Sequence, residues 1–74
     1  MPRLVECVPN FSEGRRREVV DEIIQAAAAV AGVVVLDGEL DADHNRSVVT
    51  FAGEPDAVVE AAVRAVRRAS ELID

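Results

Sequence analysis

The sequence predicts an α+β domain with the element order β-α-β-β-α, and residues 1–74 form a single domain. Two segments carry apolar residues spaced three or four apart, which indicates amphipathic helices. Three short runs rich in β-branched residues, bounded by glycine, proline or acidic turns, indicate strands. Half of the residues are apolar and 30% are charged, a composition typical of a folded chain.

The first predicted strand is the apolar stretch 4–8, and Pro9 with Asn10 predicts a turn that ends it. The first helix is expected from about residue 15 to residue 31. Ser12 is a suitable N-cap, and Glu13 places negative charge near the positive end of the helix.

Gly32 follows the last apolar position of this helix, where a left-handed residue is expected. The continuous apolar run 33–36 then predicts a buried second strand. Residues 37–46 are polar and acidic, and we interpret them as a loop. The third strand is expected at residues 47–52.

Pro55 is suited to the first position of a second helix, which is expected to continue to the final residue. Its apolar stripe is predicted to consist of Val58, Ala62, Val66, Ala69 and Ile73, with Val59, Val63 and Leu72 beside it. Two ion pairs four residues apart, Glu60–Arg64 and Arg67–Glu71, are expected on the exposed side.

A right-handed crossover makes the first two strands parallel in direction, and the loop makes the second and third antiparallel. This order is a split β-α-β, ferredoxin-like unit with its final strand missing, and its helices lie on one face of an antiparallel or mixed sheet. The first strand, 4–8, then has an open edge, which is a template for pairing with another chain. We therefore expect self-association or exchange of an element with a partner.

Charge, hydropathy and cysteine content argue against several classes of protein. A net charge of −6 argues against a nucleic-acid-binding protein. The longest uncharged run, 26–36, is too short to span a membrane. Cys7 is the only cysteine, so no internal disulfide can form, and the N-terminus has no basic region followed by an apolar stretch. We expect a cytoplasmic protein.

Two polar sites are candidates for binding. Asn10 and Ser12 precede a predicted helix start, where backbone N–H groups attract anions, but from the residues alone the roles of a turn residue and a cap are the favoured explanation. Arg46, just before the third strand, could hold a substrate carboxylate or could balance the acidic loop.

The acidic segment 37–46 does not predict a metal site. Ala42 and Val48 occupy the positions where a calcium loop needs glycine and glutamate. His44 is the only side chain that ordinarily titrates near neutrality and is the formal candidate for a general base, but a lone histidine in such a loop is typical of the surface. Cys7 lies in an apolar strand and is interpreted as a core residue. We assign no catalytic residue.

Residues 4–14 (LVECVPNFSEG) and 45–55 (NRSVVTFAGEP) closely resemble the start of the glutamate formimidoyltransferase family, and the resemblance extends over essentially the whole chain. The resemblance implies transfer of a formimino group from N-formimino-L-glutamate to tetrahydrofolate, the co-substrate, in histidine degradation. It also implies a ferredoxin-like N-terminal subdomain, with folate lying between it and a second subdomain. The catalytic histidine of the family is expected just beyond the position of Asp74.

Three residues inherit a substrate-binding role from this resemblance: Asn10, Glu39, where some relatives have aspartate, and Arg46, as a carboxylate partner. His44 does not inherit the catalytic role, because some relatives have threonine there. The expected function is a fragment of a folate-dependent transferase, inactive alone, which associates with itself or with the missing remainder. The alternative is a non-catalytic interaction module that assembles through its open edge strand, as half of a split enzyme.

Overall fold

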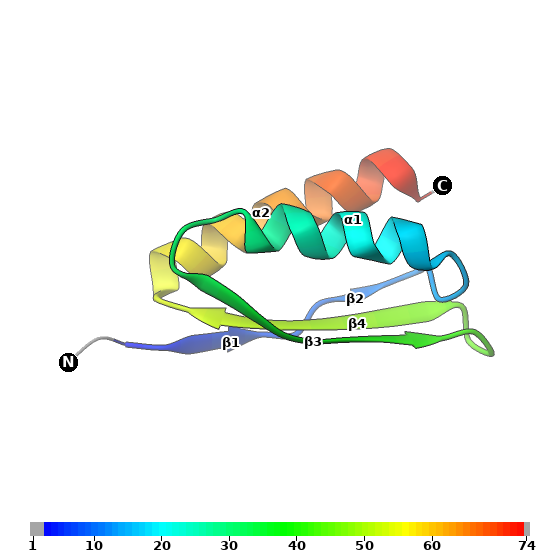
Figure 1. Cartoon of the computed structure of the whole chain (residues 1–74), viewed down its shortest axis with the longest axis horizontal. Coiled ribbons are helices and arrows are strands. Elements are labelled where there is room, and N and C mark those ends of the chain that lie inside the picture. Colours follow the sequence, from blue (N-terminus) through cyan, green and yellow to red (C-terminus); the bar gives the residue numbers. More distant parts are fainter. Residues whose placement is uncertain (1–2, 74) are drawn as a thin grey trace.

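A computed structural model describes residues 3–73, in which two helices cover one face of a four-stranded sheet (Figure 1). In chain order the elements are β1 (Val5–Cys7), β2 (Asn10–Phe11), α1 (Arg17–Ala28), β3 (Val33–Asp41), β4 (Arg46–Gly53) and α2 (Pro55–Leu72). The predicted α+β class is confirmed. Neither helix within residues 3–73 has the length and apolarity that crossing a bilayer requires.

Strand β4 lies at the centre of the sheet and pairs antiparallel with the other three strands. β1 and β2 keep one register along it: Val5 lies opposite Gly53, and Phe11 lies opposite Ser47. They therefore behave as one interrupted strand on one side of β4, while β3 occupies the other side. β1 and β3 consequently run in the same direction, as the crossover predicted.

The predicted turn at Pro9 and Asn10 is wrong, because the first strand resumes beyond the proline. Proline has no N–H to donate to a neighbouring strand, which accounts for the break in regular pairing. Its carbonyl still accepts a hydrogen bond from the Val49 amide at 3.1 Å. The chain thus stays extended through Phe11, and Asn10 lies within the sheet rather than in a turn.

The acidic segment after Leu36 is also not the predicted loop, because β3 continues to Asp41 and only residues 42–45 form the turn. A register shift between Val35 and Asp37 leaves Leu36 as the extra residue of a β-bulge. Pairing with β4 outweighs the low strand preference of aspartate and glycine. The third predicted strand is confirmed, one residue longer at each end.

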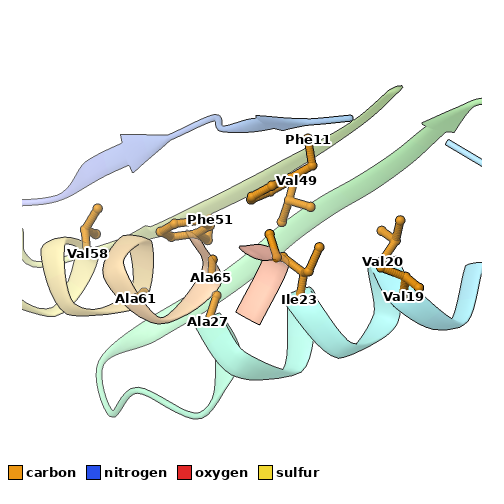
Figure 2. Close-up of a cluster of buried hydrophobic side chains, with 11 residues drawn as sticks. Phe11, Val19, Val20, Ile23, Ala27, Val49, Phe51, Val58, Ala61 and Ala65 are labelled. Carbon is orange, nitrogen blue, oxygen red and sulfur yellow. The ribbon is translucent and has the colours of Figure 1, made fainter. Parts of the chain in front are cut away.

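The core lies between the helices and the sheet. Figure 2 shows the side chains of Phe11, Val49 and Phe51 leaving the strands toward α1 and α2. Phe51 is fully buried. The buried apolar residues are Phe11, Val19, Val20, Ile23, Ala27, Val49, Phe51, Val58, Ala61, Ala65 and Ala69. The short alanine side chains leave thin helix surfaces that can approach the sheet closely.

Helix α1 begins at Arg17, later than predicted, and Ser12 does not cap it. The carboxylate of Glu13 instead receives hydrogen bonds from backbone amides just before the helix. Gly32 has the predicted left-handed conformation, with φ of 88°. It lies in the turn before β3 rather than at the helix end, because α1 stops at Ala28.

Helix α2 begins at Pro55 as predicted and ends at Leu72. Its buried stripe is rotated from the predicted one and consists of Val58, Ala61, Ala65 and Ala69. Val66, expected inside, is 57% exposed. A helix rich in alanine and valine carries adjacent apolar stripes, so periodicity alone does not decide which stripe faces the sheet.

One of the two predicted ion pairs of α2 is confirmed, between Glu60 and Arg64 at 2.7 Å. The other is wrong, because Glu71 pairs with Arg68 at 3.1 Å instead of Arg67. Arg68 also binds Glu22 of α1, so this guanidinium links the two helices. The Arg68 pKa is raised above its ordinary value, first by its hydrogen bond to Glu22.

Within residues 3–73, β1 and β2 pair only with β4, and their outer edge is free. Because the Pro9 carbonyl points toward β4, the backbone groups of Val8 and Asn10 point outward by alternation. The open edge that the element order predicted is therefore present in the described part of the chain.

Replacing Gly14 with alanine should lower the free energy of unfolding by about 1–3 kcal/mol or more. A Cβ atom there would overlap the backbone of Asp41 and Arg46, which cannot move independently of the sheet. Gly38→Ala is the control, because its Cβ would meet the flexible end of Ile24 at 2.7 Å. Urea denaturation of both variants measures the two losses, and equal losses would contradict this account of Gly14.

Candidate functional site

The three residues predicted to bind substrate all lie on the sheet face that the helices leave uncovered. Asn10 of β2 and Glu39 of β3 are the two cross-strand partners of Val48 in β4. Partners that lie opposite each other project to the same face, so both side chains flank Val48. Arg46 shares that face because side chains alternate along a strand. All but Val48 are exposed.

Apolar side chains form the floor around these polar groups. Val8 is 50% exposed and Val34 is 61% exposed, while Val48 and Ala52 between them are half-buried. An apolar surface with a few placed polar groups is the composition of most small-molecule sites. This apolar surface is open to solvent. A ligand bound to it would stay hydrated on its other side unless a second protein surface covered it.

Carboxylates line the β3 side of this floor. Asp37, Glu39 and Asp41 occupy alternate, exposed positions, and Asp41 lies opposite Arg46. Asp41 nevertheless accepts its hydrogen bonds from the turn, including one from His44 Nδ1 at 2.7 Å. That bond to the His44 side chain is the main reason that the pKa of Asp41 is lowered.

The guanidinium of Arg46 forms no ion pair with any residue of the range 3–73. Its planar set of donors matches the geometry of a carboxylate. Among the residues that share its face, it is the group best suited to hold a small anionic substrate.

The loop between β2 and α1 is held together by a buried carboxylate. Glu13 is only 5% exposed, and its Oε2 accepts hydrogen bonds from the amides of Arg15 at 3.1 Å and Arg16 at 2.9 Å. Its Oε1 accepts a further one from Arg16 Nε at 2.8 Å. The bonds from Arg16, first its amide and then its side chain, lower the pKa of Glu13.

The same loop is fixed to the β3–β4 turn. The amide of Gly14 donates to Asn45 Oδ1 at 3.0 Å, and Arg15 Nε donates to the Ala42 carbonyl at 3.1 Å. Asn45 has a φ of 50°, a left-handed conformation that asparagine tolerates better than most residues. These contacts set the position of Arg46, the next residue, relative to the loop that follows Asn10.

Sequence reasoning did not identify Glu13 and Asn45 as the residues that hold this site together. An asparagine directly before a strand is a signal for a left-handed turn residue and could have indicated the role of Asn45. The burial of Glu13 has no such signal, because an acidic residue near a helix start is ordinarily exposed.

His44 and Cys7 lie where the sequence indicated. His44 lies in the turn with 68% of its side chain exposed, as expected of a surface histidine. Cys7 is half-buried and packs against the core. In the described range 3–73, no three histidine, cysteine, aspartate or glutamate side chains come together in a way suited to a metal ion.

Comparison with known proteins gives one consistent result. A family model for the formiminotransferase domain, N-terminal subdomain, matches residues 4–74. The chain is 54% identical over 74 residues to a formimidoyltransferase-cyclodeaminase of Rattus norvegicus, covering 100% of this chain and 14% of the relative. It is 47% identical over 74 residues to a glutamate formimidoyltransferase of Streptococcus pyogenes serotype M1, covering 100% and 25%.

A glutamate formimidoyltransferase of Thermoplasma acidophilum is 52% identical over 71 residues, or 96% of this chain and 23% of the relative. The chain therefore spans at most a quarter of the length of these three relatives.

Glu13→Gln should destabilise the chain at neutral pH, and the difference from the wild type should shrink in acid. Because the folded-state pKa of Glu13 is lowered, its stabilisation is present above the unfolded pKa of about 4.3 and is lost as the pH falls through the folded value. Urea denaturation between pH 7 and pH 3 measures this difference. Glu18→Gln, at an exposed residue, is the control. A constant difference for Glu13→Gln across this range would contradict the assignment.

Proposed function

The chain belongs to the family of formiminotransferase N-terminal subdomains, and from this premise we propose that it supplies one wall of a formimino-transfer site. The reaction would move the formimino group of N-formimino-L-glutamate to tetrahydrofolate as co-substrate. The observation that carries the proposal is the gathering of Asn10, Glu39 and Arg46 on the uncovered sheet face.

The chemistry of that face suits these substrates. Arg46 offers paired donors to a carboxylate of the glutamate moiety. Glu39 can accept hydrogen bonds from the N–H groups of the formimino moiety or the reduced pterin, and Asn10 can both donate and accept. The apolar floor at Val8 and Val48 is suited to the flat face of a ring system. We place the opposite wall in a second subdomain, outside the aligned quarter of the relatives.

We propose that the chain alone does not catalyse the transfer. A general base that works near neutral pH needs a pKa near 7. The hydrogen bond from the His44 side chain lowers the pKa of Asp41, which makes this carboxylate a weaker base. His44 lies in the exposed turn and is already hydrogen-bonded to Asp41. We therefore place the acid–base group in another part of a longer protein.

The second candidate is an interaction module that assembles through the free edge of β1 and β2. The outward-pointing backbone groups of that edge favour it, because they are unpaired within residues 3–73. We propose that the chain associates through this edge with a second copy or with other parts of its parent enzyme. A strictly monomeric chain in light scattering at high concentration would contradict this.

We also propose that the protein is cytoplasmic, because Cys7 is a free thiol.

Arg46→Gln should weaken binding of N-formimino-L-glutamate by about tenfold or more, since hydrogen bonds to charged groups contribute about 1.5–3 kcal/mol. Titration followed by amide chemical shifts in NMR measures the affinity and shows which residues respond. Arg64→Gln on α2 is the matched control and should leave the affinity unchanged. Equal affinities for wild type and Arg46→Gln, or shifts confined to the helices, would contradict the proposed wall.

The isolated chain, mixed with N-formimino-L-glutamate and tetrahydrofolate, should form no formiminotetrahydrofolate above the uncatalysed rate. The reason is that we place the acid–base group of the reaction in another part of a longer protein. An absorbance assay of the folate product measures the rate. Turnover by the purified chain that disappears in Arg46→Gln would show that the site is complete without further residues.

A further inference from the structure

Asp41 and Arg46 lie directly opposite each other where β3 and β4 meet the turn that joins them (Figure 1). Side chains in such positions have Cβ atoms about 4.5–5.5 Å apart, and opposite charges there attract each other. Both residues are exposed. Within residues 3–73 they nevertheless form no ion pair, and the cause lies in the turn.

The turn occupies both carboxylate oxygens of Asp41. Oδ1 accepts hydrogen bonds from the backbone amides of Asp43 at 3.1 Å and His44 at 3.3 Å. Oδ2 lies 2.7 Å from His44 Nδ1. Because an ionised carboxylate can only accept, Nδ1 carries the hydrogen of this bond. The imidazole therefore engages the one oxygen that the backbone of the turn leaves available.

The turn itself does not depend on this imidazole. The Asn45 amide donates to the Ala42 carbonyl at 3.3 Å, and Asn45 Oδ1 accepts from the Gly14 amide at 3.0 Å. The His44 side chain is exposed, and Asp41 is its ion-pair partner. Removing the imidazole should thus release Asp41 Oδ2 and leave the fold of the turn unchanged.

A released Asp41 would compete with a ligand for Arg46. The planar donors of a guanidinium bind a carboxylate in the same way whether it belongs to a neighbouring side chain or to a substrate. If Arg46 is paired with Asp41 in some of the molecules, the apparent affinity for the ligand falls in proportion to the fraction that stays competent. An Asp41–Arg46 ion pair would therefore weaken the site.

We propose that His44 is a positioning residue of the site on the uncovered sheet face. It holds the Asp41 carboxylate in the turn and so keeps Arg46 available to the carboxylate of a substrate. This inference rests on the proposed function, because it takes Arg46 as the group that binds the substrate. Ion pairs between exposed groups are weak, so the expected effect of His44 on affinity is about two- to fivefold.

Titration with N-formimino-L-glutamate at pH 8, followed by amide chemical shifts in NMR, tests this role. That pH is well above the ordinary histidine pKa of about 6.5, so the loss of an imidazole removes a hydrogen-bond donor and little charge. His44→Ala should raise the Kd about two- to fivefold. Asp43→Ala, an exposed neighbour in the same turn, is the control and should not raise it. An unchanged Kd in His44→Ala, or an equal rise in both variants, overturns the proposal.

A second substitution separates the hold on Asp41 from a general effect of charge. Asp41→Asn keeps an acceptor oxygen for the turn amides and removes the carboxylate that competes for Arg46. Added to His44→Ala, it should restore at least the wild-type affinity. The gain from Asp41→Asn should be larger without His44 than with it, because only a released carboxylate reaches Arg46. Equal gains in the two backgrounds overturn the proposal.

The Nε–H resonance of Arg46 gives a readout that needs no ligand. When Asp41→Asn is introduced into the wild type, this resonance should stay close to its position, because the two side chains are not paired. In the His44→Ala background the same substitution should shift the resonance clearly, since it then removes an ion pair. Shifts of equal size in the two backgrounds overturn the proposal.

Arg46→Gln in the same titration judges the proposed function separately. If Arg46→Gln weakens binding and His44→Ala does not, Arg46 binds the ligand and only the role of His44 fails. If Arg46→Gln binds as tightly as the wild type while the Arg46 resonance responds as expected, the hold on Asp41 is confirmed and the substrate-binding role of Arg46 fails.

Discussion

Strand β4 has partners on both sides, and this constraint decides which residues of the chain meet the helices and which meet solvent. Successive side chains of an extended strand point to opposite faces of the sheet. Ser47, Val49, Phe51 and Gly53 are buried toward the helices, whereas Arg46 faces the other way. The side chain of each cross-strand partner points to the same face as the β4 residue opposite it. The core and the candidate site therefore lie on opposite faces of the sheet, because alternate residues of β4 point to opposite faces.

The loop from Glu13 to Arg16 holds this sheet to the helices. The Glu13 carboxylate accepts a hydrogen bond from the backbone before α1, and Gly14 packs against the backbone of β4. Arg16 Nη2 donates to the Leu72 carbonyl, at the end of α2, at 3.3 Å. Asn45 completes the contact from the turn. The position of the Arg46 backbone thus depends on the integrity of the loop.

The element types and their order were predictable because they follow from local periodicity and from Pro55 as a helix start. The extent of β3 was not, because Asp37 and Glu39 have low strand preference and are extended only through pairing with β4. The continuation past Pro9 likewise depends on a distant partner. The family resemblance identified Asn10, Glu39 and Arg46, but only the strand register shows that they share a face. Glu13 was interpreted as a charge near the helix start, and its buried hydrogen bonds are visible only in three dimensions.

We propose that the ligand binds on the uncovered face, between the outer strands and above Val48. Intermolecular nuclear Overhauser effects between N-formimino-L-glutamate and the methyl groups of Val48 measure this most directly. We predict contacts from the formimino proton to Val48 and its neighbour Val8, with none to Val59. Contacts to the valines of α2, with none to Val48, would contradict it.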